Sequence, residues 1–227
     1  MSALGQSSSD LTPQLVAGTS GGLSLGGLPR PSKEPRAVDN ARIYIVGSHS
    51  TGKTSLARWI SKVYKLPLVT EVARSVLAER ELPLEVLRTD IERTADFQEE
   101  VFRRQAIAEE RAGARYVSDR AFDNLAYAAS HTISVKKIAA GVAAGYIDRL
   151  REYGSVIFFV RPQRELVAQD GVRERVDWDE LVRIDGMVKL LLEQNDLDYV
   201  VISTLSMAER ARTVRAVLRP YGLSPIS

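Results

Sequence analysis

The sequence predicts an α/β fold in three layers, a five-stranded parallel sheet with helices on both faces. Two observations lead to this prediction. From residue 40 onward, short apolar runs alternate with long amphipathic stretches, and the central runs are almost continuously apolar. Strands that are buried on both faces have this composition, and the alternation of strand and helix is typical of a parallel sheet.

The predicted strands are the short runs rich in β-branched and aromatic residues. In chain order they cover residues 42–46, 66–70, 115–118, 156–160 and 199–202. Between them, apolar residues recur at the spacing of one helix face. This spacing predicts helices that end near residue 64, lie between residues 84 and 111, and cover residues 135–153, 178–192 and 207–218. We find no internal repeat and expect one domain over residues 40–227.

Residues 1–39 have a different composition. They hold 6 of the 15 glycines, 4 of the 9 prolines and no aromatic residue, and their three basic and three acidic residues cancel. Such a segment cannot bury enough apolar surface to offset the entropy of ordering its backbone. We therefore expect a disordered tail, and its scattered leucines leave open that it docks a protein partner.

The whole chain is close to neutral. Its formal net charge of +2 comes from 31 basic and 29 acidic residues, so nucleic acid is not indicated as a partner, although a local basic site stays open. Cysteine is absent and only two histidines are present, which excludes Cys-ligated metals and disfavours a histidine-built site. No apolar run approaches the roughly 20 residues of a membrane helix, and the N-terminus does not resemble a secretory signal. A cytoplasmic protein without a membrane partner is expected.

The most specific motif follows the first predicted strand. It matches the pattern G-x-x-x-x-G-K-[ST] of a phosphate-binding loop, or P-loop, and opens a predicted helix. In such a loop the backbone N–H groups face phosphate oxygens, the lysine reaches the β- and γ-phosphates and the following hydroxyl ligates Mg²⁺. The predicted cofactors are therefore ATP and Mg²⁺, with these residues binding the nucleotide: Gly47, Ser48, His49, Ser50, Thr51, Gly52, Lys53, Thr54 and Ser55.

Two carboxylates follow other predicted strands, where ligands of parallel sheets bind. Asp119 ends the third strand and precedes Arg120; this acid suits a Mg²⁺ site or activation of a hydroxyl, and the arginine suits a phosphate clamp. The alternative is an Asp that only caps a helix. Glu71 follows the second strand and is a candidate for contact with the substrate, or else forms a surface ion pair with Arg74.

A cluster of arginines follows the fourth predicted strand. It consists of Arg161, Arg164, Arg173 and Arg175, and it suits a lid that closes over a triphosphate and stabilises negative charge. The alternative is a solvated charged helix. The loop 203–206, after the last strand, is a candidate position for the adenine.

Taken together, the P-loop, the stretch 71–74, the stretch 118–120 with Asp123 and Tyr127, and the stretch 170–177 resemble the NadR-like AAA ATPase and kinase family. The resemblance covers roughly residues 41–215 and implies a three-layer P-loop NTPase fold. It implies Glu71 as the general base or anchor of the substrate hydroxyl, Asp119 as the Mg²⁺-linked acid, Arg120 as a clamp and Arg173 as the lid arginine. The chain departs from NadR-type proteins because the 39-residue tail stands where they have a nucleotidyltransferase domain.

Three functions are compatible with these residues. The first is a kinase that transfers the γ-phosphate of ATP to a hydroxyl of a nucleoside-like or nucleotide-like small molecule. The second is a kinase that acts on a nucleotide within DNA or RNA. The third is an ATPase that acts as a nucleotide-dependent switch for a partner. A GTPase is disfavoured because the chain lacks an Asn/Thr-Lys-x-Asp element.

Overall fold

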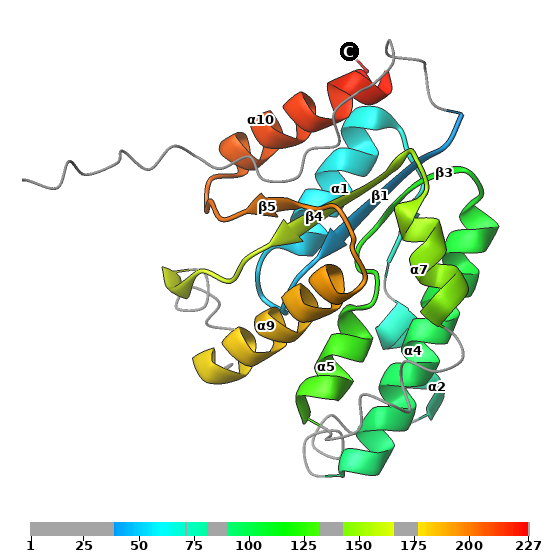
Figure 1. Ribbon diagram of the computed structural model, residues 1–227, viewed down its shortest axis with the longest axis vertical. Coiled ribbons are helices and arrows are strands. Elements are labelled where there is room, and N and C mark those ends of the chain that lie inside the picture. Colours follow the sequence, from blue (N-terminus) through cyan, green and yellow to red (C-terminus); the bar gives the residue numbers. More distant parts are fainter. Residues whose placement is uncertain (1–38, 71, 81–89, 132–142, 166–176, 227) are drawn as a thin grey trace, which may run out of the picture.

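The computed structural model describes residues 39–70, 72–80, 90–131, 143–165 and 177–226. Its strands form a parallel sheet in the order β2-β3-β1-β4-β5 (Figure 1). The predicted five-stranded parallel sheet is therefore confirmed. The five strands are β1 (Ala41–Val46), β2 (Leu68–Val69), β3 (Arg115–Ser118), β4 (Ser155–Val160) and β5 (Val200–Ile202).

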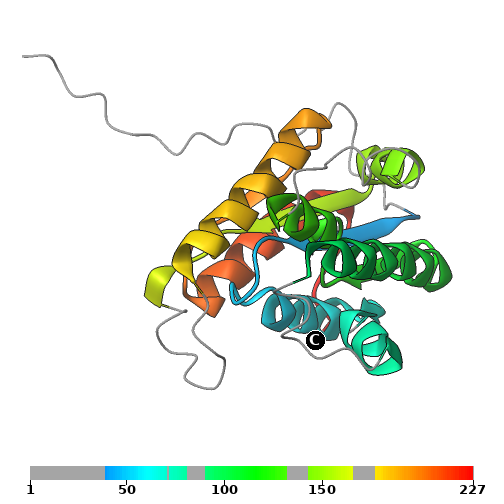
Figure 2. The same cartoon turned by 90° about the horizontal axis from the view of Figure 1, so that it is seen from below.

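Helices cover both faces of this sheet. On one face lie α1 (Lys53–Tyr64) and α10 (Met207–Leu218), which the short helix η1 (Arg219–Tyr221) follows. On the other face lie α4 (Ile91–Ala112), α5 (Asp123–His131), α7 (Ala143–Arg151) and α9 (Trp178–Gln194). Figure 1 shows α10 on one side of the strands and α9 and α5 on the other. A further helix, α2 (Val72–Arg80), lies against α4 (Figure 2).

The side chains of β1 show why the fold has three layers. Ile43 and Ile45 belong to the apolar cluster beneath α1 and α10, whereas Tyr44 and Val46 belong to the cluster beneath the helices of the other face. All four side chains are fully buried. Because alternate residues of a strand point to opposite faces, a strand covered on both sides must be apolar throughout.

Two α-helices of the described residues were not predicted, and some predicted boundaries differ. Short α2 and α5, of nine residues each, were missed because they span only about two and a half turns of apolar periodicity. The strand expected over residues 66–70 pairs only at Leu68 and Val69. The helix expected over residues 135–153 is described as α7 from Ala143, since residues 135–142 lie outside the described part of the chain.

The sheet order makes the carboxyl ends of β1 and β3 the expected position of a ligand. Strands β2 and β3 lie on one side of β1, and β4 and β5 lie on the other. Helix α1 leaves β1 toward one face while α5, after β3, packs on the opposite face. Open parallel sheets bind ligands where neighbouring connections diverge in this way. Of the predicted tail only Asp39 is described, and no helix in the described ranges could cross a membrane.

Candidate active site

The P-loop lies between the end of β1 and the start of α1, and its first glycine is required by close packing. A Cβ atom at Gly47 would lie 2.3 Å from the carbonyl oxygen of Val160 on β4, and the φ angle is +143°. Any side chain here would force the loop away from the neighbouring strand. The sheet itself therefore fixes where the loop begins.

The second glycine allows the loop to enter α1. Gly52 has a left-handed φ of +84° and is the N-cap of the helix. No side chain caps this helix end, and no acidic residue lies in its first turn. The first N–H groups of a helix lack partners within it and lie at the positive end of its dipole. The start of α1 is thus suited to bind an anion.

Lys53 is buried against the loop that precedes it. Its ammonium nitrogen donates hydrogen bonds to the carbonyl oxygens of Gly47 and Ser48, over 2.8 and 2.6 Å. Burial lowers the pKa of Lys53 to about 8, and the nearby carboxylate of Asp123 opposes this shift. The loop carbonyls therefore hold the Lys53 ammonium group in place. A phosphate bound in the loop would compete with these carbonyls for its hydrogen bonds.

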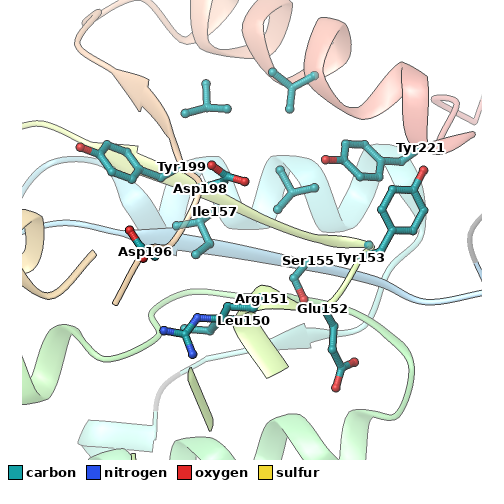
Figure 3. A pocket seen from close by; sticks show the side chains of 14 residues that line it. Leu150, Arg151, Glu152, Tyr153, Ser155, Ile157, Asp196, Asp198, Tyr199 and Tyr221 are labelled. Carbon is teal, nitrogen blue, oxygen red and sulfur yellow. The ribbon is translucent and has the colours of Figure 1, made fainter. Parts of the chain in front are cut away.

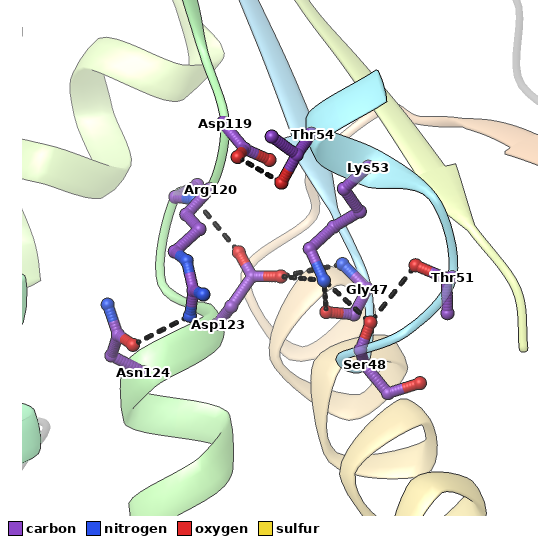
Figure 4. Close-up of polar contacts among 10 residues, drawn as sticks. Gly47, Ser48, Thr51, Lys53, Thr54, Asp119, Arg120, Asp123 and Asn124 are labelled. Atoms are coloured by element: carbon purple, nitrogen blue, oxygen red, sulfur yellow. Dashed lines mark hydrogen bonds and ion pairs between the residues drawn. The ribbon is translucent and has the colours of Figure 1, made fainter. Parts of the chain in front are cut away.

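Thr54 and Asp119 contact each other at the carboxyl ends of β1 and β3 (Figure 4). The Thr54 hydroxyl donates a hydrogen bond of 2.6 Å to Oδ2 of Asp119, and the Thr70 hydroxyl donates one of 3.3 Å to the same oxygen. The other oxygen, Oδ1, is buried and accepts no hydrogen bond from the described residues. Burial raises the pKa of Asp119, against the lowering effects of the Thr54 hydrogen bond and of Lys53.

Asp123 connects the P-loop to the start of α5. Its Oδ1 accepts a hydrogen bond of 2.7 Å from the Gly47 amide and lies 4.0 Å from the Lys53 nitrogen, while Oδ2 accepts one of 2.8 Å from the Ala121 amide (Figure 4). Sequence reasoning noted Asp123 only as part of the family resemblance. Its position four residues after Asp119, at the start of α5, was the available signal.

Arg120 lies beside this group without contacting it directly. Its guanidinium donates a hydrogen bond of 3.2 Å to the side chain of Asn124, the second residue of α5. Its positive charge contributes to lowering the pKa of Lys53. The structure thus brings together Lys53, Thr54, Asp119 and Arg120 of the predicted site.

The remaining predicted site residues are distributed differently. The His49 ring lies 6.3 Å from the Tyr127 ring of α5, and Ser55 is exposed on α1. Ser50 has a left-handed φ of 58°, and Thr51 donates a hydrogen bond to the Ser48 carbonyl. Glu71 and Arg173, like Arg175 of the arginine cluster, lie outside the described residues.

The two described arginines of the expected lid have partners of their own. The guanidinium of Arg161 makes two contacts with buried Asp185 on α9, of 3.1 and 2.7 Å. Arg164 lies over the Trp178 ring, with 4.8 Å between the guanidinium carbon and the ring centre. Both contacts anchor the segment after β4 to α9. Asp185 also acts on the pKa of Lys53, so the Arg161–Asp185 pair lies near the P-loop, and the lid stays a prediction because Arg173 and Arg175 lie outside the described residues.

One buried arginine that the sequence analysis did not identify forms a hydrogen bond with the P-loop. Arg210 of α10 donates hydrogen bonds to the carbonyl oxygens of Thr51 and Thr204, over 2.9 and 2.8 Å. It therefore ties the P-loop to the loop 203–206, the candidate adenine position. An arginine on the apolar face of α10, between Met207 and Val214, was the signal in the sequence.

The strand order and the P-loop define the class of the protein, a P-loop protein with a parallel α/β fold. A family model described as an AAA domain matches residues 42–210, and the chain belongs to this family. No curated protein sequence matches the chain.

Several solved structures share the fold. The NadR protein in complex with NR has a TM-score of 0.65 and 18% identity, over 83% of this chain and 53% of that chain. The NadR protein in complex with NAD and AMP-PNP has a TM-score of 0.54 and 16% identity, over 83% and 51%. Deoxyadenosine kinase from M. mycoides, with dCMP and dCDP bound, has a TM-score of 0.58 and 12% identity, over 78% and 98%. This chain thus spans about half the length of NadR, and the likeness concerns the fold.

Proposed function

We propose that this protein is an ATP-dependent kinase that phosphorylates a hydroxyl group of a nucleoside-like or nucleotide-like small molecule. The observation that supports this most directly is the grouping of Lys53, Thr54 and Asp119 at the mouth of the P-loop. The shared fold with NadR and with deoxyadenosine kinase supports an acceptor of this class.

The P-loop residues bind the phosphates of ATP. The start of α1 offers its free N–H groups to phosphate oxygens, and Lys53 neutralises charge on the β- and γ-phosphates. Asp123 keeps the first N–H group of the loop in a fixed direction. Phosphoryl transfer requires mainly this kind of positioning and charge neutralisation.

Thr54 and Asp119, at the carboxyl ends of β1 and β3, have side chains suited to bind a Mg²⁺ ion. Mg²⁺ prefers oxygen ligands and is usually held by one or two protein groups together with phosphates and water. Thr54 and Asp119 provide such oxygens, and Oδ1 of Asp119 has no other partner among the described residues. No group of three or more His, Cys, Asp or Glu side chains suited to a metal occurs in the described ranges. When bound, the ion would neutralise charge between the phosphates.

Glu71 is the proposed base that accepts the proton of the acceptor hydroxyl. The preceding residue, Thr70, contacts Asp119 at the carboxyl end of the sheet. Arg120 and Arg173 are the proposed clamps for the substrate and for the charge of the transferred group.

The acceptor is tested by a screen with the purified full chain, ATP and Mg²⁺. Nucleosides, nicotinamide riboside, nucleoside monophosphates and oligonucleotides are added one at a time, and ADP and the phosphorylated product are quantified. We expect one class of acceptor to yield product and ADP in equal amounts. ADP release that is the same with and without every acceptor would instead indicate an ATPase, and product from oligonucleotides alone would indicate a kinase of nucleic acids.

A further inference from the structure

A second pocket lies at the end of the sheet opposite the P-loop. It has a volume of about 200 Å³ and is formed where β4 and β5 begin and where α7 and α10 end. We call it the tyrosine pocket, because three tyrosines and two aspartates give it its chemical character (Figure 3). These residues are Tyr153, Tyr199, Tyr221, Asp196 and Asp198.

The pocket exists because β5 is shorter than β4. Strand β5 pairs only with Phe158–Val160, so that residues 155–157 of β4 have no partner in β5. Residues 155–157 form part of the pocket lining, with Val200 and Val217 beside them. The floor of the pocket is thus apolar side chain and strand backbone.

Aromatic rings form the outer wall. The rings of Tyr153 and Tyr221 lie 5.8 Å apart at an angle of 38°, and Tyr153 is 64% exposed. Tyrosine, which combines an apolar ring with a polar hydroxyl, is enriched in surfaces that bind a partner.

The pocket has negative charge that the described residues do not balance. Asp196 and Asp198 make no hydrogen bond or ion pair through their carboxylates in the described ranges. The neighbouring Arg151 donates to the Asn195 carbonyl and to Asp148, and Glu152 is paired with Arg42. Two aspartates therefore remain available to a cationic ligand.

The N-terminal tail enters the domain beside this pocket. Asn40 passes directly over Gly154, a lining residue, since a Cβ at Gly154 would lie 2.4 Å from the Asn40 side-chain oxygen and 2.5 Å from its carbonyl oxygen. Four residues of extended chain reach about 13 Å. Arg36 can therefore lie at the pocket without any rearrangement of the domain.

The tail has the composition that such a pocket would bind. Between Pro29 and Arg36 its sequence is Pro-Arg-Pro-Ser-Lys-Glu-Pro-Arg. The basic residues Arg30, Lys33 and Arg36 recur at intervals of three. Proline favours the polyproline II helix, which has three residues per turn, so all three cations would project from one side. Aromatic-lined grooves are known to bind proline-rich segments in the polyproline II conformation.

We propose that the segment Pro29–Arg36, here called the basic segment, binds in the tyrosine pocket of its own chain. The prolines pack on Tyr153 and Tyr221, and the cations face Asp196 and Asp198. A short tether gives the segment a high effective concentration at the pocket, so modest contacts suffice. Because the P-loop lies at the other end of the sheet, this docking leaves the nucleotide site open.

The absence of cysteine allows a direct test on the full chain. Ser32→Cys introduces a single attachment point for a nitroxide label, and paramagnetic broadening of backbone amide signals is measured by NMR. We expect broadening of amides at residues 151–155 and 196–200 and none at the P-loop. A label at Ser8→Cys is the matched control and should broaden these amides less. Broadening over the P-loop, or at no defined surface, would overturn the proposal.

Charge reversal separates this binding from a nonspecific effect. Asp196→Lys with Asp198→Lys should abolish the broadening at the pocket, and 1 M salt should weaken it. Adding Arg30→Glu, Lys33→Glu and Arg36→Glu to the same chain should restore it, which also shows that the variant domain is folded. The assigned contacts would be wrong if the variant with both aspartates changed to lysine kept the broadening. They would also be wrong if the three added glutamate substitutions failed to restore it.

A mixed sample identifies the chain to which the segment belongs. Spin-labelled chains without isotope are mixed with isotope-labelled chains without spin label. Within one chain, no broadening is expected in this mixture. Broadening at the pocket of the isotope-labelled chain would replace the proposal with docking onto a second copy.

Discussion

The hydroxyl of Thr54 donates a hydrogen bond to the carboxylate of Asp119, over 2.6 Å, although the two residues are 65 positions apart in the sequence. Thr54 belongs to the first turn of α1, and Asp119 follows the last residue of β3. The contact exists because β1 and β3 are neighbours and parallel, so that their carboxyl ends meet at one edge of the sheet.

This pair predicts a specific dependence on Mg²⁺. Asp119→Asn keeps the size of the side chain and removes its charge, so we expect the Mg²⁺ concentration for half-maximal turnover to rise at least tenfold. Thr54→Ser, which retains the hydroxyl, should stay close to the parent protein, whereas Thr54→Ala should resemble Asp119→Asn. Titrations of turnover with Mg²⁺ check this. An unchanged midpoint in Asp119→Asn would remove Asp119 from the proposed metal site.

Lys53→Ala should abolish nucleotide turnover. The variant loses a buried cation that faces both Asp123 and the P-loop carbonyls. Removing a preorganised charge-stabilising group typically costs about a hundredfold or more in rate. Lys62→Ala, an exposed lysine in the last turn of the same helix, is the control and should have normal turnover. Turnover in Lys53→Ala within a few-fold of the control would contradict the proposed role.

Glu71→Gln should separate binding from transfer. The amide cannot take up the proton of the acceptor hydroxyl, but it leaves the P-loop unchanged, so ATP affinity should persist while product formation falls. Calorimetry with ATP and quantification of the phosphorylated acceptor measure the two effects. Transfer that is intact in Glu71→Gln and absent in Asp119→Asn would move the role of base to Asp119.

Gly47→Ala should disrupt the P-loop and strongly reduce ATP binding. A Cβ atom at residue 47 would collide with the Val160 carbonyl, and the φ of +143° is unfavourable for alanine. Gly145→Ala is the matched control because its Cβ would meet nothing within 4 Å and it lies in α7. Alanine there should stabilise the protein by about 0.5–1 kcal/mol through helix propensity. Urea unfolding and ATP titration of both variants distinguish the two sites.

Glu109 should make stability depend on pH. This fully buried glutamate of α4 accepts hydrogen bonds at Oε1 from Gln105, Ser118 and Tyr146. Burial still outweighs these bonds and raises the pKa of Glu109 to about 7. The folded state therefore binds a proton that the unfolded state has lost, and the free energy of unfolding should fall as pH rises from about 4.5 to about 7.

The size of this effect is on the order of 3 kcal/mol if the unfolded glutamate has its ordinary pKa. Glu109→Gln should remove it, so that the variant exceeds the parent in stability at pH 8 and loses this advantage near pH 5. Glu99→Gln, an exposed substitution on the same helix, should follow the parent at both values. Denaturant unfolding measured across this pH range checks the prediction. If the free energies of unfolding of the parent and of Glu109→Gln changed in parallel with pH, Glu109 would be ionised in the folded protein and the prediction would be wrong.

Sequence patterns predicted the strands well because buried strands of a parallel sheet are continuous apolar runs. The runs around Ile43, Val117 and Phe158 each became a strand, with boundaries that differ by a residue or so. The P-loop was equally accessible, since its glycines and Lys53 follow a fixed spacing in the sequence, and Lys53 contacts carbonyl groups only five and six residues before it. Short helices such as α5 gave too little periodicity to be detected.

The sequence by itself determined local features. These are the apolar runs, the positions of the glycines in the P-loop, and the spacing of the basic residues in the tail. Only the tertiary structure decided which distant groups meet. It brought Asp123 to the Gly47 amide and Arg210 to the Thr51 carbonyl, and it paired Arg161 with Asp185. Local patterns arise from periodicity and backbone conformation, whereas these partners depend on strand order and on the faces on which the helices pack.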